Sequence, residues 1–145
     1  MSKKKKSLEW VEGRFSVVPH RMMDSLSYSH LNFAAKCLLM ELIRQLNGSN
    51  NGHLQLTSTW LRKRGWTSSE TIHRATEELI RSGLVVRTKQ GGLNIGPSQF
   101  AVTWLPISNF IGLEMAPSDY RRMVFLLADP APRIKSASSQ ARSSA

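Results

Sequence analysis

The chain has 145 residues, a formal net charge of +10 and a hydrophobic fraction of 41%. At roughly 150 residues per domain, this length predicts one domain, and the hydrophobic fraction is too high for a wholly disordered chain. No apolar run approaches the roughly 20 residues that span a bilayer, and no apolar segment follows the lysine-rich start. The sequence therefore predicts neither a membrane anchor nor a secretory leader, and its single cysteine, Cys37, fits a reducing cytoplasm.

The positive charge is unevenly distributed along the chain. Residues 1–14 and 130–145 each carry a net charge of +3, and their composition predicts a disordered basic arm and a disordered tail, with a merely solubilising role as the alternative for each. Residues 57–89 hold seven basic and three acidic side chains, while the rest of 15–129 is neutral. Such a cluster, with an isoelectric point near 10.5, is typical of a nucleic-acid-binding protein.

The first half of the chain predicts one long helix with short elements around it. Residues 15–18 (FSVV) form a short apolar run before Pro19, which predicts an edge strand or an extended lead-in, and a helical turn follows at about residues 22–26. A helix is expected over 33–46 with Asn32 as its N-cap. Its apolar stripe at helical spacing consists of Ala35, Leu38, Leu39, Leu42, Ile43 and Leu46.

The second half begins with a turn at 47–52 (NGSNNG) and a short strand within 53–56. Thr57 is expected to cap a helix over 58–64 that ends at Gly65. Thr67 and Glu70 fit a capping box for a helix over 68–82, which ends at Gly83.

Two strands, 84–88 and 100–104, then form a hairpin with a long glycine-rich loop. Beyond it, a short helix capped at Ser118 is expected.

Two short helices joined by a glycine turn predict a helix-turn-helix unit, and the hairpin after the second helix would be a wing. The stretch LRKRGWTSSETIHRATEELIRSGLVVRTKQGGLN, followed by FAVTWLPI, resembles the winged helix-turn-helix family of short bacterial proteins from phages, prophages and plasmids. The residues that carry this resemblance are Gly65, Thr67, Ser68, Thr71, Ile72, Ala75, Leu79, Gly83, Thr88, Gln90, Gly91, Gly92, Thr103, Trp104, Leu105, Pro106 and Ile107.

The resemblance covers about residues 15–110 and implies an α+β, mainly α fold, with a three-helix core and a small β-hairpin wing. One departure is Arg64, where an apolar residue often precedes the turn glycine, so Trp60 and Trp66 are expected to pack the first helix of the pair. We expect a basic arm at 1–14, the winged helix-turn-helix domain at 15–108, a C-terminal extension with a short helix at 109–129, and a tail at 130–145.

Double-stranded DNA is the expected partner, because an α-helix fits the major groove and the N-terminal part of a recognition helix meets the base edges. Arg74 is expected to contact guanine, basic residues of the preceding helix to contact phosphates, and wing residues to lie along a minor groove. The expected DNA-binding residues are Arg62, Lys63, Arg64, Thr67, Ser68, Ser69, Thr71, His73, Arg74, Arg87, Lys89, Gln90 and Asn94.

The sequence does not predict an enzyme. Its four histidines have no cysteine or carboxylate at metal-ligand spacing, and the glycine-rich loop lacks the Lys-Ser/Thr pair of a nucleotide site, so no metal and no cofactor is expected. The leading hypothesis is a transcriptional regulator of a phage or mobile element, with a homodimer as a secondary expectation. The alternatives are an accessory DNA-binding factor in replication or transfer, and a module that binds a host protein or nucleoprotein complex.

Overall fold

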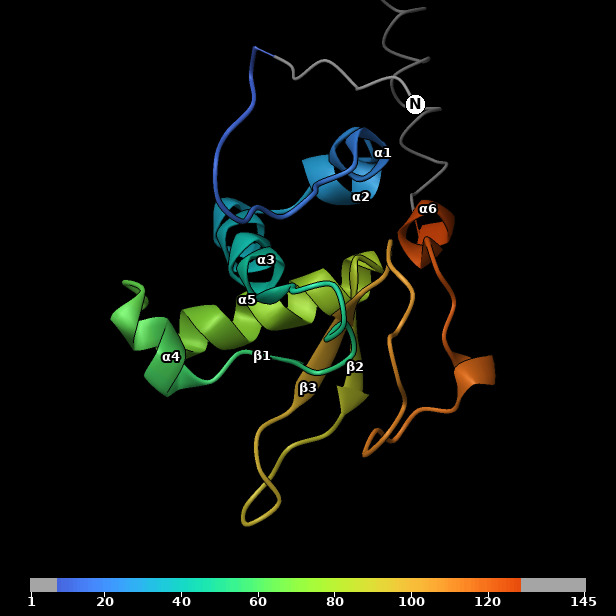
Figure 1. Cartoon of the computed structure of the whole chain (residues 1–145). Helices are drawn as coiled ribbons and strands as arrows, with labels where there is room; N and C mark the ends of the chain where they lie inside the picture. The colour runs from blue at the N-terminus through green and yellow to red at the C-terminus, as the bar shows by residue number, and fades with distance from the viewer. Residues whose placement is uncertain (1–7, 129–145) are drawn as a thin grey trace, which may run out of the picture.

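The computed structural model describes residues 8–128. Within this range the chain forms six α-helices and a three-stranded antiparallel sheet, an α+β fold as expected (Figure 1). In chain order the elements are α1 (His20–Met23), α2 (Leu26–Ser29), α3 (Phe33–Gln45), β1 (Leu54–Gln55), α4 (Ser58–Lys63), α5 (Ser69–Ser82), β2 (Val85–Lys89), β3 (Gln99–Val102), a 3₁₀ turn (Pro117–Asp119) and α6 (Val124–Ala128). The expected tail and the first seven residues of the expected arm lie outside the described residues.

Helix α3 forms as the periodicity predicts. The Asn32 side chain accepts a hydrogen bond from the amide of Ala35 at 2.8 Å and so caps the helix. Five of the six residues in the predicted stripe are fully buried, and Leu46 is half-buried just after the last turn. The helical turn expected before α3 is present as the two short helices α1 and α2.

Helix α5 begins one residue later than the sequence indicates. Ser68, and not Thr67, is the N-cap, because the Ser68 hydroxyl accepts from the amide of Thr71 at 3.1 Å. The predicted capping box of Thr67 and Glu70 is therefore wrong. In the turn before it, the amide of Trp66 donates to the carbonyl of Leu61 at 3.0 Å. At the other end Gly83 adopts a φ of +83° and ends α5 as expected.

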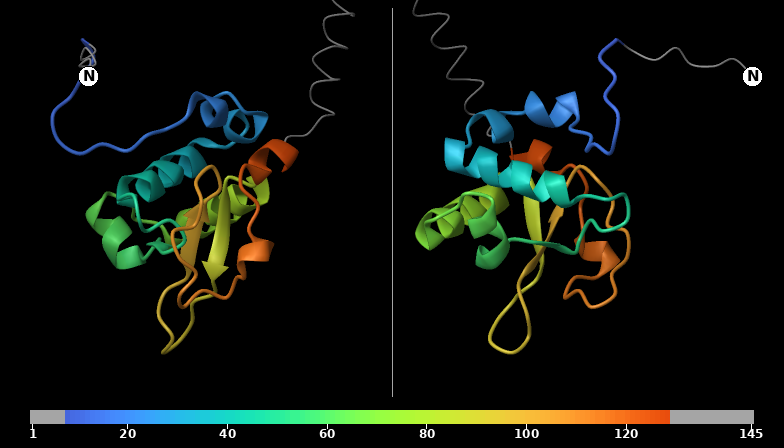
Figure 2. Two further views of the ribbon diagram at one scale, coloured as in Figure 1. Left: turned by 45° about the vertical axis from the view of Figure 1, so that its right-hand side comes forward. Right: turned by 60° about the vertical axis from the view of Figure 1, so that its left-hand side comes forward.

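The three strands lie in the order β1-β3-β2, with Leu54 opposite Phe100 and Val85 opposite Val102. The hairpin β2–β3 projects its loop away from the helices (Figure 2). Strand β3 ends at Val102 and not at Trp104, and there the side chain of Asn51 accepts from the amide of Val102 and donates to its carbonyl.

The expected edge strand at 15–18 does not form. The segment is extended, but it pairs with no strand among residues 8–128. Instead, the Ser16 hydroxyl donates to the carbonyl of Ile43 at 2.9 Å, which holds the segment against the C-terminal end of α3. The extended lead-in that was expected as the alternative is what the structure contains.

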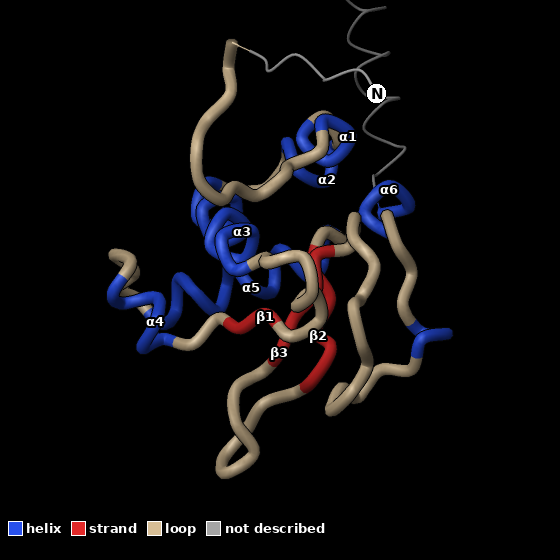
Figure 3. Tube along the Cα trace, viewed as in Figure 1, coloured by secondary structure: helices blue, strands red, loops and turns tan. Residues whose placement is uncertain are grey.

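The segment after β3 runs as a loop beside β2 and returns to the helices (Figure 3). The amide of Glu114 donates to the carbonyl of Thr88 at 2.9 Å, so this segment covers the outer edge of β2. A short helix does form, but α6 begins at Val124 and not at Ser118. Met123, at a φ of +61°, directs its amide to the carbonyl of Thr103 and so prevents an earlier start.

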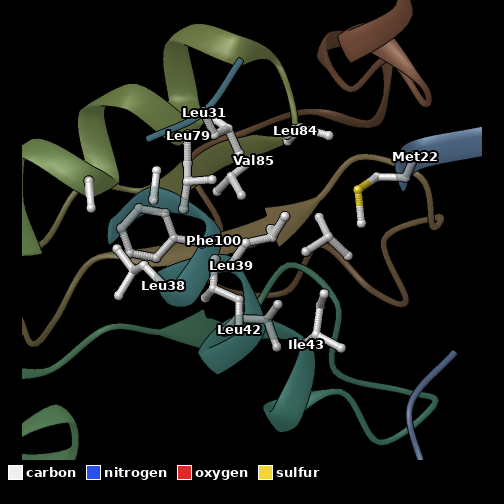
Figure 4. Close-up of a cluster of buried hydrophobic side chains, with 14 of the residues drawn as sticks. Met22, Leu31, Leu38, Leu39, Leu42, Ile43, Leu79, Leu84, Val85 and Phe100 are labelled. Atoms are coloured by element: carbon white, nitrogen blue, oxygen red, sulfur yellow. The ribbon is translucent and has the colours of Figure 1, made fainter. Parts of the chain in front are cut away.

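One hydrophobic core joins the helices to the sheet. Leu38, Leu39 and Leu42 from α3 and Leu79 from α5 gather around Phe100 of β3 (Figure 4). Phe125 of α6 is fully buried in the same core, although it lies beyond the expected domain end at residue 108. The returning segment therefore packs as part of the core.

Tyr120 anchors this returning segment, and its hydroxyl lies 3.0 Å from the carbonyl oxygen of Val102. Burial raises the pKa of Tyr120 from 10.0 to about 12, because the phenolate is poorly solvated there. The folded state thus keeps this proton to higher pH than the unfolded state does. The contribution of Tyr120 to the free energy of unfolding should be intact below pH 10 and lost as the pH rises toward 12.

Chemical denaturation of the wild type and Tyr120→Phe across this pH range checks this expectation. Because lysines and the other tyrosine titrate in both proteins, the difference between the two curves isolates Tyr120. We expect the wild type to lose more stability than the variant above pH 10. Parallel curves would contradict the burial of this hydroxyl.

Candidate nucleic-acid interface

Helices α4 and α5 are joined by a tight turn. The amides of Arg64 and Trp66 both donate to the carbonyl of Leu61, and Gly65 between them adopts a φ of +98°. Leu61 is fully buried and Trp66 is half-buried, so both residues fix α4 against the core. This arrangement sets where the N-terminal end of α5 projects.

The N-terminal half of α5 presents a polar face to solvent. Ser69, His73 and Arg74 are exposed there, whereas Ala75, Thr76 and other core residues face inward. Arg74 lies 3.8 Å from Glu70 one turn earlier, and the two side chains are 70% and 78% exposed. An exposed pair of this kind contributes at most about 0.5 kcal/mol, so the guanidinium can readily take another partner.

Two of the arginines expected to contact DNA pair with carboxylates of the protein. Arg64 pairs with Glu41 of α3 and lies over the ring of Trp60, and the indole of Trp66 donates to the same carboxylate at 2.9 Å. A salt bridge of 3.2 Å joins Arg87 of β2 to Glu77 of α5.

Arg87 also lies over the ring of Phe100 and is only 30% exposed, so it braces the hairpin against α5. Sequence reasoning missed both pairs. Glu77 and Arg87 lie ten residues apart, one in α5 and the other in β2, so neither the helical nor the strand period predicts that they meet.

Four other basic side chains of residues 57–89 are not paired with carboxylates. Among the described residues, Arg62, Lys63, Arg81 and Lys89 form no ion pair. Arg62 and Lys63 are exposed in the last turn of α4, and Lys89 lies where β2 passes into the hairpin loop. Of these four, Arg62, Lys63 and Lys89 flank α5, and Arg81 lies in its last turn.

The other predicted residues divide into structural and exposed ones. Ser68 is the cap of α5, Thr67 is exposed beside it, and Thr71 is half-buried. In the hairpin loop, the amide of Gln90 is bound by the carboxylate of Glu114 at 3.0 Å, whereas Asn94 is exposed at the tip with a φ of +65°.

A concave surface of about 490 Å³ lies between the start of α4, the exposed edge of α5 and the hairpin loop. Ser69 and His73 line it from α5, and Gly91, Gly92 and Gly96 line it from the loop. The N-terminal half of α5 and the hairpin loop therefore border one face of the molecule. None of the residues that line this part of the described structure is a lysine or an arginine.

Comparisons of the chain with protein-family models, with curated proteins and with solved structures find no match. Within residues 8–128, no three His, Cys, Asp or Glu side chains lie close enough together to hold a metal ion. No helix in the same range has the length and apolar character needed to cross a membrane. The expectation that the chain is not an enzyme and binds no cofactor stays a prediction.

Proposed function

We propose that the chain is a winged helix-turn-helix protein that binds double-stranded DNA in the cytoplasm and regulates transcription for a phage or mobile element. The observation that carries the proposal is the single face bordered by the N-terminal half of α5 and the β2–β3 loop. The element order α3-β1-α4-α5-β2-β3 supports it, because α5 then stands where a recognition helix would and the loop where a wing would. The origin in a mobile element rests on the sequence resemblance.

In this proposal α5 enters the major groove with Ser69, His73 and Arg74 toward the bases. Arg62, Lys63 and Lys89 are free of carboxylates among the described residues, so we assign them to phosphates on either side. Arg64 and Arg87 are withdrawn from the contact set, because their charge is already matched within the protein. The lysines at 3–6 would add attraction that is independent of sequence.

Arg74 and Lys63 provide a matched pair of variants. Arg74→Ala should weaken binding to the preferred site by about 1–3 kcal/mol and relax selectivity, because it removes a bidentate contact to a base. Lys63→Ala should weaken all sequences alike and lower the salt slope by about 1. Selection from a random duplex pool, followed by affinities for the selected and a scrambled site, measures both. An equal loss on both sites for Arg74→Ala would assign Arg74 to phosphate.

The two alternative functions are separated by where the protein binds. Genomic fragments captured by the chain and sequenced should fall in promoters if it is a regulator. Fragments from a replication origin or a transfer site would favour an accessory factor. Absence of any duplex binding at low salt would favour a module that docks on a host protein.

A homodimer stays a secondary proposal. One small recognition helix rarely supplies enough specificity, and dimers read two half-sites about one helical turn apart. The mass of the protein–DNA complex tests this, because a palindromic selected site should carry two chains.

A further inference from the structure

The tip of the β2–β3 loop exposes two large apolar side chains. Leu93 is 91% exposed and Ile95 is 56% exposed, on either side of Asn94. They lie at the end of a hairpin that projects from the rest of the molecule (Figure 2). Single exposed apolar residues are ordinary, but two at the apex of a projecting hairpin form a small wedge.

The backbone of the tip is closed by its own hydrogen bonds. The amide of Gly92 donates to the carbonyl of Gly96 at 3.0 Å, and the amide of Ile95 donates to the carbonyl of Gly92 at 3.3 Å. At the neck of the loop, a Cβ on Gly91 would lie 2.3 Å from the amide nitrogen of Ser98. The two sides of the neck therefore lie close together, which makes the hairpin narrow below the tip.

The loop carries no charge with which to bind phosphates. Residues 90–98 (QGGLNIGPS) contain no charged side chain, in a chain of net charge +10. The nearest cations, Arg87 and Lys89, lie at the base of the hairpin, and Arg87 is occupied by Glu77. What the tip offers is apolar surface with one amide side chain between its two halves, that of Asn94.

We propose that Leu93 and Ile95 form a wedge that inserts between base pairs from the minor groove and bends the DNA. Apolar side chains that enter the minor groove unstack a base step and kink the duplex by about 20–90°, and asparagine hydrogen-bonds to base edges there. The base of this loop, at Gly91, Gly92 and Gly96, borders the same face as the N-terminal half of α5, so in the proposed complex the tip would extend along the duplex beyond α5. This inference rests on the proposed DNA binding.

The wedge also predicts a preference for certain base steps that does not depend on hydrogen bonds to the bases. Pyrimidine–purine steps such as TpA unstack most easily, so the bound site should favour such a step beneath the tip. In the selected sequences this preference would appear beside the positions that α5 contacts.

The test is the bend angle of a selected duplex, measured by energy transfer between dyes at its two ends. The wild type should bend the DNA by at least about 20°. The double variant L93S/I95S should bind with little bend, and its affinity ratio between sites with TpA and GpC beneath the tip should fall toward one. The control I111S replaces an apolar residue outside the hairpin that is 81% exposed, and it should bend DNA as the wild type does.

The outcomes separate the wedge from DNA binding itself. Equal bending by the wild type and L93S/I95S, or binding without any bend, would overturn the wedge and leave the proposed function standing. Failure of the wild type to bind any duplex would overturn both. Unchanged bending together with a loss of self-association in L93S/I95S would reassign the tip to a protein contact. Both substituted residues are exposed, so an unchanged melting temperature is the check on folding.

Discussion

Replacing Phe125 by alanine should lower the free energy of unfolding by about 3–5 kcal/mol, because it removes a large side chain from a core that cannot fully close around the cavity. Phe125 has no exposed surface, and its carbonyl accepts a hydrogen bond from the Ser27 hydroxyl at 2.7 Å. The residue thus ties α6 to α2 across 98 positions of sequence. Chemical denaturation of both proteins measures the effect.

Leu127 on the same helix is the matched control, since its side chain is 69% exposed. Leu127→Ala should change the free energy of unfolding by less than about 0.5 kcal/mol. If Phe125→Ala costs no more than Leu127→Ala, then α6 is an appendage and the core ends where the sequence suggested, near residue 108.

Replacing Asn51 by leucine should cost about 3 kcal/mol, because it leaves buried backbone groups without partners. Asn51 is 3% exposed, and its side chain accepts from the amide of Val102 at 2.8 Å and donates to carbonyls at the end of β3 and just after it. Those carbonyls are Val102, Leu105 and Pro106, at 3.0, 3.2 and 3.0 Å. One side chain therefore fixes the exit of the hairpin to the turn after α3.

Asn109→Leu is the control for Asn51→Leu. Asn109 is exposed and makes one local hydrogen bond, from the amide of Ile111, so its replacement should cost less than about 1 kcal/mol. Urea denaturation of the two variants and the wild type gives the comparison. Equal losses for both variants would mean that the Asn51 network adds nothing beyond a surface turn.

The sequence predicts those parts of the fold that depend on local patterns. The apolar spacing of α3, the caps Asn32 and Thr57 and the stop at Gly83 all follow from neighbouring residues, and all four are present. Ser68 shows the limit of this approach. Two adjacent hydroxyl residues can each cap a helix, and the local pattern alone does not decide between them.

The path of residues 105–128 could not be predicted in the same way. It depends on Tyr120, Asn51 and Phe125 meeting partners far along the chain, and no periodic pattern marks such contacts. The candidate site shows the same division. Exposure of Ser69, His73 and Arg74 follows from the helical period, whereas the pairing of Arg64 and Arg87 with carboxylates depends on tertiary geometry.

The ion pairs also reduce the number of unpaired basic side chains in residues 57–89. Residues 57–89 carry a net charge of +4, which the sequence alone would distribute over the whole helix-turn-helix. In the structure three of the seven cations, Arg64, Arg74 and Arg87, lie beside carboxylates. In the proposed complex, binding to phosphates would depend on Arg62, Lys63 and Lys89 beside α5 and on the lysine block at 3–6.

Duplex binding across a salt series is the most direct test of the central claim. The three proposed phosphate contacts, those of Arg62, Lys63 and Lys89, give a slope of log affinity against log salt near −3, and the lysines at 3–6 would steepen it to about −6. Fluorescence anisotropy of a labelled selected duplex between about 50 and 200 mM salt measures this slope. We expect binding at the lowest salt with a slope in that range. No binding at the lowest salt, or a slope shallower than about −1, would contradict the proposal that this chain binds DNA.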